Sequence, residues 1–138
     1  MGDTERMGEN ADIVRRLYDA FNRGDTAAAY ELIDPEIEYV NPEDAVEPGT
    51  RHGLRDYDGA MKQVREVFGA ARIETEQLVE SGDRVAAVVS FEFHARGSGL
   101  EAATRQGHVW TIRNGKAVRF EWSNDPDRAL AAVRDTSS

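Results

Sequence analysis

The chain contains no cysteine, so neither disulfide cross-links nor thiolate chemistry can contribute to it. It also lacks any apolar run approaching the roughly 20 residues that a membrane-spanning helix needs. The first ten residues are polar and have no apolar stretch typical of a signal peptide. These absences predict a cytoplasmic protein that makes no contact with membranes.

Positive charge is in the minority, with 17 Lys and Arg against 26 Asp and Glu and a formal net charge of −9. An acidic surface repels phosphate backbones, so we expect no nucleic-acid partner. The sequence has no phosphate-binding loop, no dinucleotide-binding glycine pattern and no Gly-x-Ser-x-Gly elbow. Its three histidines, His52, His94 and His108, lack the spacing of metal ligands, and we expect no metal.

Helical spacing of apolar residues marks three segments in the first half of the chain. The first segment begins at a cap formed by Asn10 or Asp12 and ends at Gly24, which can adopt a left-handed conformation. A shorter helix follows from Asp25 to about Ile33. The third helix runs from Leu54 to Phe68. The apolar stripe of the first helix comprises Ile13, Val14, Leu17, Tyr18 and Phe21.

Alternating apolar residues predict strands at residues 37–41, 72–80, 84–96, 103–113 and 116–123. Loops are expected at residues 42–52 and 97–99. Asn114-Gly115 predicts a tight hairpin, because both of its turn positions require positive φ. A last helix starts after Asp125, with Pro126 in its first turn.

This order of elements predicts an α+β domain. In it, a curved antiparallel sheet and three N-terminal helices form a cone that encloses a pocket, followed by a short C-terminal helix. The expected organisation is a flexible N-terminus at residues 1–9, a single domain at residues 10–134 and a flexible C-terminus at residues 135–138.

Four local patterns, in this order, resemble the SnoaL-like (polyketide cyclase-like) family of the nuclear transport factor two-like superfamily. They are Phe21-Asn22-Arg23-Gly24-Asp25, the segment from Leu32 to Tyr39, Arg51-His52-Gly53, and the segment from His108 to Phe120. The resemblance extends from about Asp12 to Val133. It implies a hydrophobic pocket for a small molecule, no metal or organic cofactor in the enzyme members, and a homodimer in which the sheet face carrying His94 is the contact surface.

Three polar residues are candidates for catalysis. Tyr39 and Asn41 share one face of a strand and match a Tyr-x-Asn pattern that orients water in similar epoxide hydrolases. His108 matches a pocket histidine of similar cyclases, and its ordinary pKa near 6.5 suits proton transfer. The alternatives stay open: Tyr39 packs in the core, Asn41 caps the turn before Pro42, and His108 is a hydrogen-bonded strand residue.

The carboxylates of the similar enzymes are missing from this chain. Trp122 stands where they carry an aspartate, Val89-Ser90-Phe91 stands where the epoxide hydrolases carry Arg-x-Asp, and Asn41 stands near the base of the ketosteroid isomerases. Glu121 would face the pocket only if a bulge turned it inward. The residues expected to contact a ligand are Trp110, Trp122, Phe91 and Phe120, with His52 at the rim.

Two functions therefore remain. The first is a cofactor-independent isomerase, cyclase or hydrolase that acts on a small hydrophobic carbonyl compound or epoxide by acid/base chemistry. The second is a non-catalytic small-molecule binding or dimerisation domain, which the missing carboxylates favour.

Overall fold

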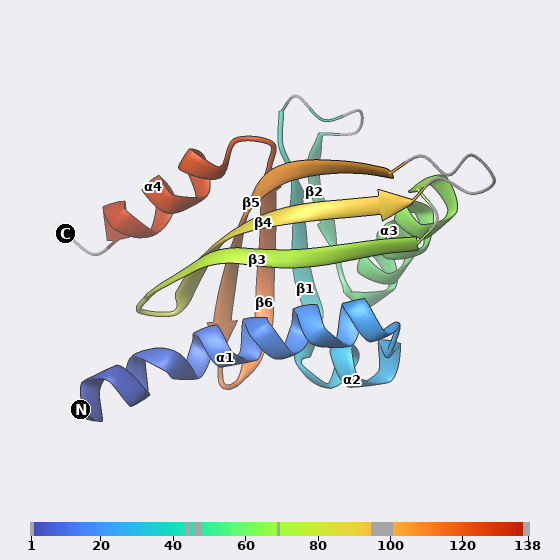
Figure 1. The fold of residues 1–138 in the computed structure, drawn as a ribbon. Coiled ribbons are helices and arrows are strands. Elements are labelled where there is room, and N and C mark those ends of the chain that lie inside the picture. The colour runs from blue at the N-terminus through green and yellow to red at the C-terminus, as the bar shows by residue number, and fades with distance from the viewer. Residues whose placement is uncertain (1, 44, 46–47, 69, 95–100, 137–138) are drawn as a thin grey trace.

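The fold of this computed structural model consists of a curved sheet with helices on both of its faces (Figure 1). The structure describes residues 2–43, 45, 48–68, 70–94 and 101–136. The helices are α1 (Gly2–Arg23), α2 (Thr26–Glu31), α3 (Leu54–Phe68) and α4 (Pro126–Thr136). The strands are β1 (Ile33–Asn41), β2 (Gly49–His52), β3 (Ala70–Ser81), β4 (Arg84–His94), β5 (Glu101–Arg113) and β6 (Lys116–Ser123).

The six strands form one sheet in the order β2-β1-β6-β5-β4-β3. Neighbouring strands are antiparallel except β1 and β6, which run parallel and place Tyr39 opposite Phe120. The predicted α+β architecture is confirmed. The expectation of a purely antiparallel sheet is wrong at this one pair, where the first strand is inserted beside the last.

The first helix is longer than its apolar stripe predicted. It begins at Gly2, so residues 2–9, expected as a loose end, are helical, and the predicted cap at Asn10 or Asp12 is wrong. Asn10 Nδ2 instead donates to the Gly82 carbonyl, and Glu80 Oε1 accepts from the Ala11 N–H. These bonds hold the middle of α1 against the turn between β3 and β4.

The junction between α1 and α2 follows the prediction. Gly24 has a φ of 70°, which a residue without a Cβ adopts at little cost. Asp25 then caps α2, since its carboxylate accepts a hydrogen bond from the Ala28 N–H at 3.1 Å. This turn sends the chain back so that α2 lies beside the end of α1 (Figure 1).

The segment that follows differs from the prediction in two places. The second helix ends at Glu31, and Pro35 lies within β1, where the pairing with β6 shifts register between Ile33 and Glu38. Residues 49–52, predicted as loop, form the edge strand β2 against β1. The predicted loop at residues 97–99 lies outside the described residues, as does Gly69, which follows the third helix.

Alternation along β4 directs its side chains into two separate apolar clusters. Val85, Ala87 and Val89 face α1 and α3, in the larger cluster. Ala86 and Val88 face the other way and pack with Val109 against α4, through Ala129, Leu130 and Val133. The sheet therefore has a helical layer on each face, and α4 closes the face opposite α1.

Gly107 permits the close approach of α4 to β5. A Cβ built at this position would lie 2.8 Å from the Ala129 Cβ and 2.9 Å from the Pro126 Cα. No side chain other than hydrogen fits there without moving the helix. The neighbours of Gly107 in β5, Gln106 and His108, point to the opposite face of the sheet.

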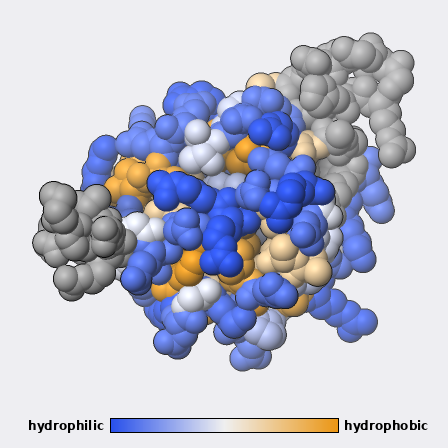
Figure 2. Space-filling model, turned by 60° about the horizontal axis from the view of Figure 1, so that its bottom comes forward, coloured by the Kyte–Doolittle hydropathy of each residue, from blue (hydrophilic) through white to orange (hydrophobic). Residues whose placement is uncertain are grey.

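The face of the molecule in Figure 2 is mostly hydrophilic. Figure 2 shows one face on which charged and polar residues surround separate apolar patches. Within the part of the chain that the structure describes, no helix is long and apolar enough to cross a membrane.

Candidate ligand pocket

A cavity of about 360 Å³ lies between the concave side of the sheet and the helices α1, α2 and α3. Its wall is mainly aromatic and aliphatic. Asp25, Thr104 and Asn124 are exposed and mark where the cavity opens to solvent. The apolar and aromatic lining residues are Leu17, Tyr18, Ala20, Phe21, Ala29, Tyr30, Tyr39, Tyr57, Met61, Ile73, Phe91, Trp110, Phe120 and Trp122.

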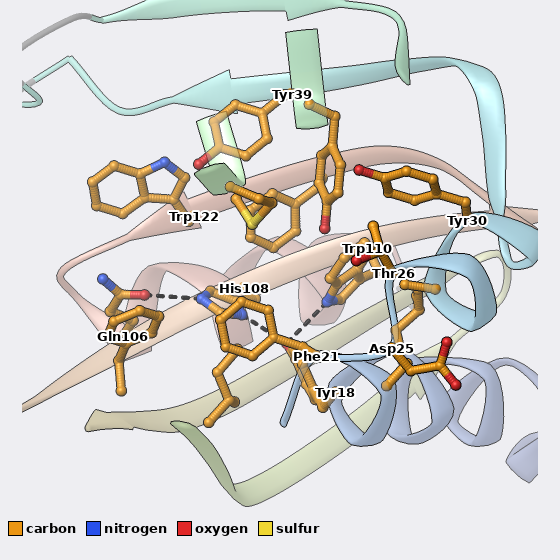
Figure 3. A pocket seen from close by; sticks show the side chains of 18 of the residues that line it. Tyr18, Phe21, Asp25, Thr26, Tyr30, Tyr39, Gln106, His108, Trp110 and Trp122 are labelled. Atoms are coloured by element: carbon orange, nitrogen blue, oxygen red, sulfur yellow. Dashed lines mark hydrogen bonds between the residues drawn. The ribbon is translucent and has the colours of Figure 1, made fainter. Parts of the chain in front are cut away.

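A chain of hydrogen bonds crosses this wall (Figure 3). Trp110 Nε1 donates to the Tyr18 hydroxyl at 2.9 Å. The same hydroxyl lies 2.7 Å from His108 Nδ1, and His108 Nε2 lies 3.0 Å from Gln106 Oε1. The four side chains come from α1 and β5, and the first three are buried.

The partners fix where the proton of His108 resides. With Gln106 Oε1 facing the ring, this oxygen can only accept, so Nε2 of His108 carries the hydrogen in this arrangement. Nδ1 is then the acceptor, and the Tyr18 hydroxyl donates to it. Every donor in the chain therefore has an acceptor, and the hydroxyl of Tyr18 points to the histidine rather than to the cavity.

Burial holds these groups in their neutral forms. His108 is 3% exposed, and desolvation lowers its pKa from 6.5 to about 3. Burial also raises the pKa of Tyr18 well above its ordinary value, an effect that its bond from Trp110 partly offsets. At neutral pH, His108 is an uncharged imidazole and Tyr18 an intact phenol.

A second polar group lies on the side of β1 and β6. Trp122 Nε1 donates to Asn41 Oδ1 at 2.7 Å. Burial raises the pKa of Tyr39 to about 12, while the nearby Arg51 and the Trp122 N–H lower it by smaller amounts. Tyr39 thus stays protonated and offers a phenol to this part of the wall.

Phe120 joins the two polar groups. Its ring lies 4.9 Å from the His108 ring at an interplanar angle of 74° and 4.4 Å from the Trp110 ring. It also lies 5.4 Å from the Tyr39 ring. Contacts of this kind fix the orientation of aromatic side chains, so the wall presents flat faces in defined positions.

Most of the residues that the sequence nominates meet in this cavity. His108, Tyr39, Trp110, Trp122, Phe91 and Phe120 all line it. Asn41 is not among the lining residues and instead anchors Trp122 from behind. His52 is exposed in β2, where it pairs with Glu38, and it does not line the cavity either.

Tyr18 and Gln106 were missed as site residues. Tyr18 fits the apolar stripe of its helix, so the pattern assigned it to packing. Gln106 shares a strand face with His108 and Trp110, and this parity was the available signal.

Glu121 does not turn inward. Its carboxylate lies 3.4 Å from Arg119 Nε, and Arg119 in turn lies 3.5 Å from the Glu38 carboxylate. Glu121 is not among the residues that line the cavity. The described residues include no group of His, Asp and Glu side chains that could hold a metal ion.

Comparison with known proteins agrees with this architecture. The sequence profile of the SnoaL-like domain matches residues 14–120. This chain belongs to the SnoaL-like domain family. No curated protein matches it. The solved structures that it resembles share the fold over 79–98% of their length.

Three of these structures illustrate the likeness. TerC, co-crystallised with polyporic acid, is 27% identical with a TM-score of 0.74, and the match covers 92% of this chain and 98% of TerC. An NTF2-like protein of unknown function from Burkholderia pseudomallei is 26% identical with a TM-score of 0.71, covering 91% and 97% of the two chains. A loop truncation variant of IdmH is 25% identical with a TM-score of 0.73, covering 88% and 97%.

Proposed function

We propose that this SnoaL-like protein binds an uncharged, ring-containing small molecule in the cavity. One observation carries the proposal: among the described residues that line the cavity, Asp25 alone has a side chain that is charged at neutral pH. Asp25 lies at the exposed opening and is engaged as the cap of α2. The interior therefore offers aromatic faces and neutral hydrogen-bonding groups.

The chemistry of the wall selects against ions. Burying a carboxylate or an ammonium group without a partner of opposite charge is costly. The cavity size, about 360 Å³, lies within the range of small-molecule sites. A molecule with fused or linked rings can stack on Phe120 and Trp122 and place an oxygen near the tyrosine hydroxyls. The co-crystal of TerC with polyporic acid supports a small molecule as the ligand class.

A second candidate function is catalysis by a cofactor-independent isomerase, cyclase or hydrolase acting on a hydrophobic carbonyl compound or epoxide. The hydrogen-bonded pair of Tyr18 and His108 favours it, because a phenol beside a neutral imidazole can donate a proton or polarise a carbonyl. Trp122 in place of a carboxylate disfavours it, because indole accepts no proton. Binding is therefore the function that the geometry supports best.

Tryptophan fluorescence tests the binding proposal directly. The chain has two tryptophans, Trp110 and Trp122, and both line the cavity. Titration with 9-fluorenone should change their emission, and Trp122→Phe and Trp110→Phe should divide the signal between them. The carboxylate 9-oxofluorene-4-carboxylate should bind at least about tenfold more weakly than 9-fluorenone. Equal affinity for the anion, or emission that no member of a panel of neutral ketones and quinones alters, would refute the proposal.

Catalysis has a separate test. An isomerase or cyclase of the second kind should exchange the α-hydrogens of bound 1-tetralone with deuterium from solvent, and His108→Gln should abolish the exchange. Exchange no faster than in buffer alone would exclude these two activities and leave binding or epoxide hydrolysis.

The expectations of a homodimer and of a cytoplasmic location remain predictions. Sedimentation equilibrium of the purified protein tests the first, and fractionation of expressing cells tests the second.

A further inference from the structure

Tyr18 is part of the cavity wall, but its hydroxyl is already hydrogen-bonded to His108. In the observed arrangement, hydrogen bonds run from Trp110 to Tyr18, from Tyr18 to His108 and from His108 to Gln106. This series of hydrogen bonds ends at the side-chain amide of Gln106. The amide carries an acceptor oxygen and a donor NH₂ group of almost the same size. The direction in which these hydrogen bonds run, from donor to acceptor, therefore depends on which end of the Gln106 amide faces His108.

Rotating the Gln106 amide by 180° reverses the direction of two hydrogen bonds, the one between Gln106 and His108 and the one between His108 and Tyr18. The amide NH₂ then donates to His108 Nε2, so the imidazole hydrogen must reside on Nδ1. Nδ1 donates to the Tyr18 oxygen, which still accepts from Trp110 Nε1. The hydrogen of the Tyr18 hydroxyl then has no acceptor among Trp110, His108 and Gln106, and it is available to an acceptor in the cavity that Tyr18 lines.

We propose that Gln106 and His108 form a tautomeric switch that releases the Tyr18 hydroxyl to donate a hydrogen bond to a carbonyl oxygen of the ligand. The inference rests on the proposed binding function and narrows its ligand class to ring compounds that carry such an oxygen. Tyr18 is the residue that recognises the oxygen, whereas His108 and Gln106 act through it as positioning residues.

The hydrogen-bond inventory explains why the ligand drives the switch. Where the cavity offers no hydrogen-bond acceptor, the reversed arrangement leaves a buried hydroxyl donor unsatisfied, so the observed arrangement is favoured. A carbonyl oxygen beside Tyr18 removes this penalty, because it accepts the released hydrogen. A hydrocarbon of the same shape supplies no acceptor and leaves the observed arrangement in place.

The reversal changes no net protonation. The imidazole and the Tyr18 hydroxyl each carry one hydrogen before and after. Nε2 gives up its hydrogen to solvent at the Gln106 end, Nδ1 takes the hydrogen of the Tyr18 hydroxyl, and the Tyr18 oxygen takes a hydrogen from solvent in the cavity. Exchange through solvent is possible at the Gln106 end, where the exposed Thr104 and Asn124 mark the opening. The neutral state of His108 agrees with this scheme, since an imidazolium would donate from both nitrogens and have no tautomers.

The matched probes 9-fluorenone and fluorene, which differ in one carbonyl oxygen, test the switch. Long-range ¹H–¹⁵N correlation spectra identify which nitrogen of His108 carries the hydrogen. The free protein and the fluorene complex should show the hydrogen on Nε2, and the fluorenone complex should show it on Nδ1. Dissociation constants for both probes come from tryptophan fluorescence.

Two variants complete the design. Tyr18→Phe removes the hydroxyl. Gln106→Glu supplies only acceptor oxygens, which hold the hydrogen of a neutral His108 on Nε2. Its carboxylate also favours the imidazolium, so this variant is measured at a pH at which the ¹⁵N spectra show a neutral ring. In each variant, the ratio of the two dissociation constants should shift against fluorenone by about three- to tenfold relative to wild type, the effect of one hydrogen bond. Using the ratio removes any loss of affinity common to both probes, and near-ultraviolet circular dichroism confirms folding.

The outcomes separate this inference from the proposed function. If both probes bind but His108 keeps its hydrogen on Nε2 with fluorenone, the switch is wrong and the binding function stands. The switch is also wrong if the ratio of the dissociation constants for fluorenone and fluorene is the same in Tyr18→Phe as in the wild type. If neither probe nor any other neutral ring compound binds, the binding function fails and the switch fails with it.

Discussion

Trp122 Nε1 donates a hydrogen bond to Asn41 Oδ1 over 2.7 Å, joining the ends of the two parallel strands β1 and β6. Both residues lie one position past Val40 and Glu121, the last partners in the pairing of β1 with β6. The sequence nominated Asn41 as a group that orients water. Its amide instead holds the indole that forms part of the cavity wall, so we assign it a positioning role.

Replacing Asn41 should therefore change the environment of the Trp122 indole while the protein still folds. Asn41→Leu leaves the indole N–H without its acceptor, and we expect a loss of about 1 kcal/mol in the free energy of unfolding. The Trp122 emission should shift, as measured in a Trp110→Phe background. Asn41→Asp is the matched control, because its carboxylate keeps an acceptor at the same place. Identical emission in the Leu and Asp variants would contradict this role.

The stability of the protein should fall in mild acid because of His108. Its pKa is lowered from 6.5 in the unfolded chain to about 3 in the fold, so the unfolded state binds the proton first. Stability is then complete above about pH 6.5 and declines as the pH falls toward 3. Between about pH 7 and pH 5, this residue should cost about 2 kcal/mol.

Urea denaturation at the two pH values measures this loss. His108→Gln, which has no titratable group, should lose about 2 kcal/mol less than wild type over the same interval. Equal pH dependence in both proteins would show that His108 is accessible to protons in the folded state.

Gly107→Ala should destabilise the contact between α4 and the sheet. The added methyl would lie within 3 Å of Ala129 and Pro126, so either the helix or the strand must move. Overpacking of this kind costs about 1–3 kcal/mol. Gly59→Ala in α3 is the control: its Cβ meets nothing within 4 Å, and removing a helical glycine should stabilise by about 0.5–1 kcal/mol. Thermal unfolding of the two variants should therefore move in opposite directions.

Asn22 should protect the edge strand β3 from solvent exchange. Its side-chain amide donates to the Ile73 carbonyl at 2.9 Å and accepts from the Ile73 N–H at 2.8 Å, as a neighbouring strand would. In Asn22→Ala, the Ile73 amide should exchange at least about tenfold faster, in line with the loss of one hydrogen bond. Asn22→Asp keeps an acceptor for this amide and should exchange at an intermediate rate. Unaltered exchange in Asn22→Ala would place the protection elsewhere.

Periodicity predicted the elements that bury a regular apolar face. The spacing in α3 and the alternation in β4 and β6 identified these segments because core packing requires such patterns. Asn114 and Gly115 have φ values of 53° and 77°, as the hairpin signal required. Strand β2 was missed because three of its four residues are exposed, and an exposed edge strand carries no apolar alternation.

The polar connections of the site could not be read from the sequence. Strand parity placed His108, Trp110 and Trp122 on the cavity side. The bond between Tyr18 and His108, however, joins residues 90 positions apart on a helix and a strand. Local patterns specify which face a residue occupies, whereas a contact of this kind depends on how the helix docks on the sheet. For the same reason, parity could suggest Asn41 as a cavity residue but could not show that Trp122 would engage it.

The parallel pairing of β1 with β6 also determines when the cavity can form. During synthesis, the chain from α1 to β4 is complete before Trp110, Phe120 and Trp122 have been made. Tyr18, on the apolar stripe of α1, therefore leaves the ribosome before its hydrogen-bond partners His108 and Trp110 have been made. Contacts between such distant segments slow folding, and exposed apolar surface in incomplete chains promotes aggregation. Nascent chains that stall before β5 should be the species that most need a chaperone.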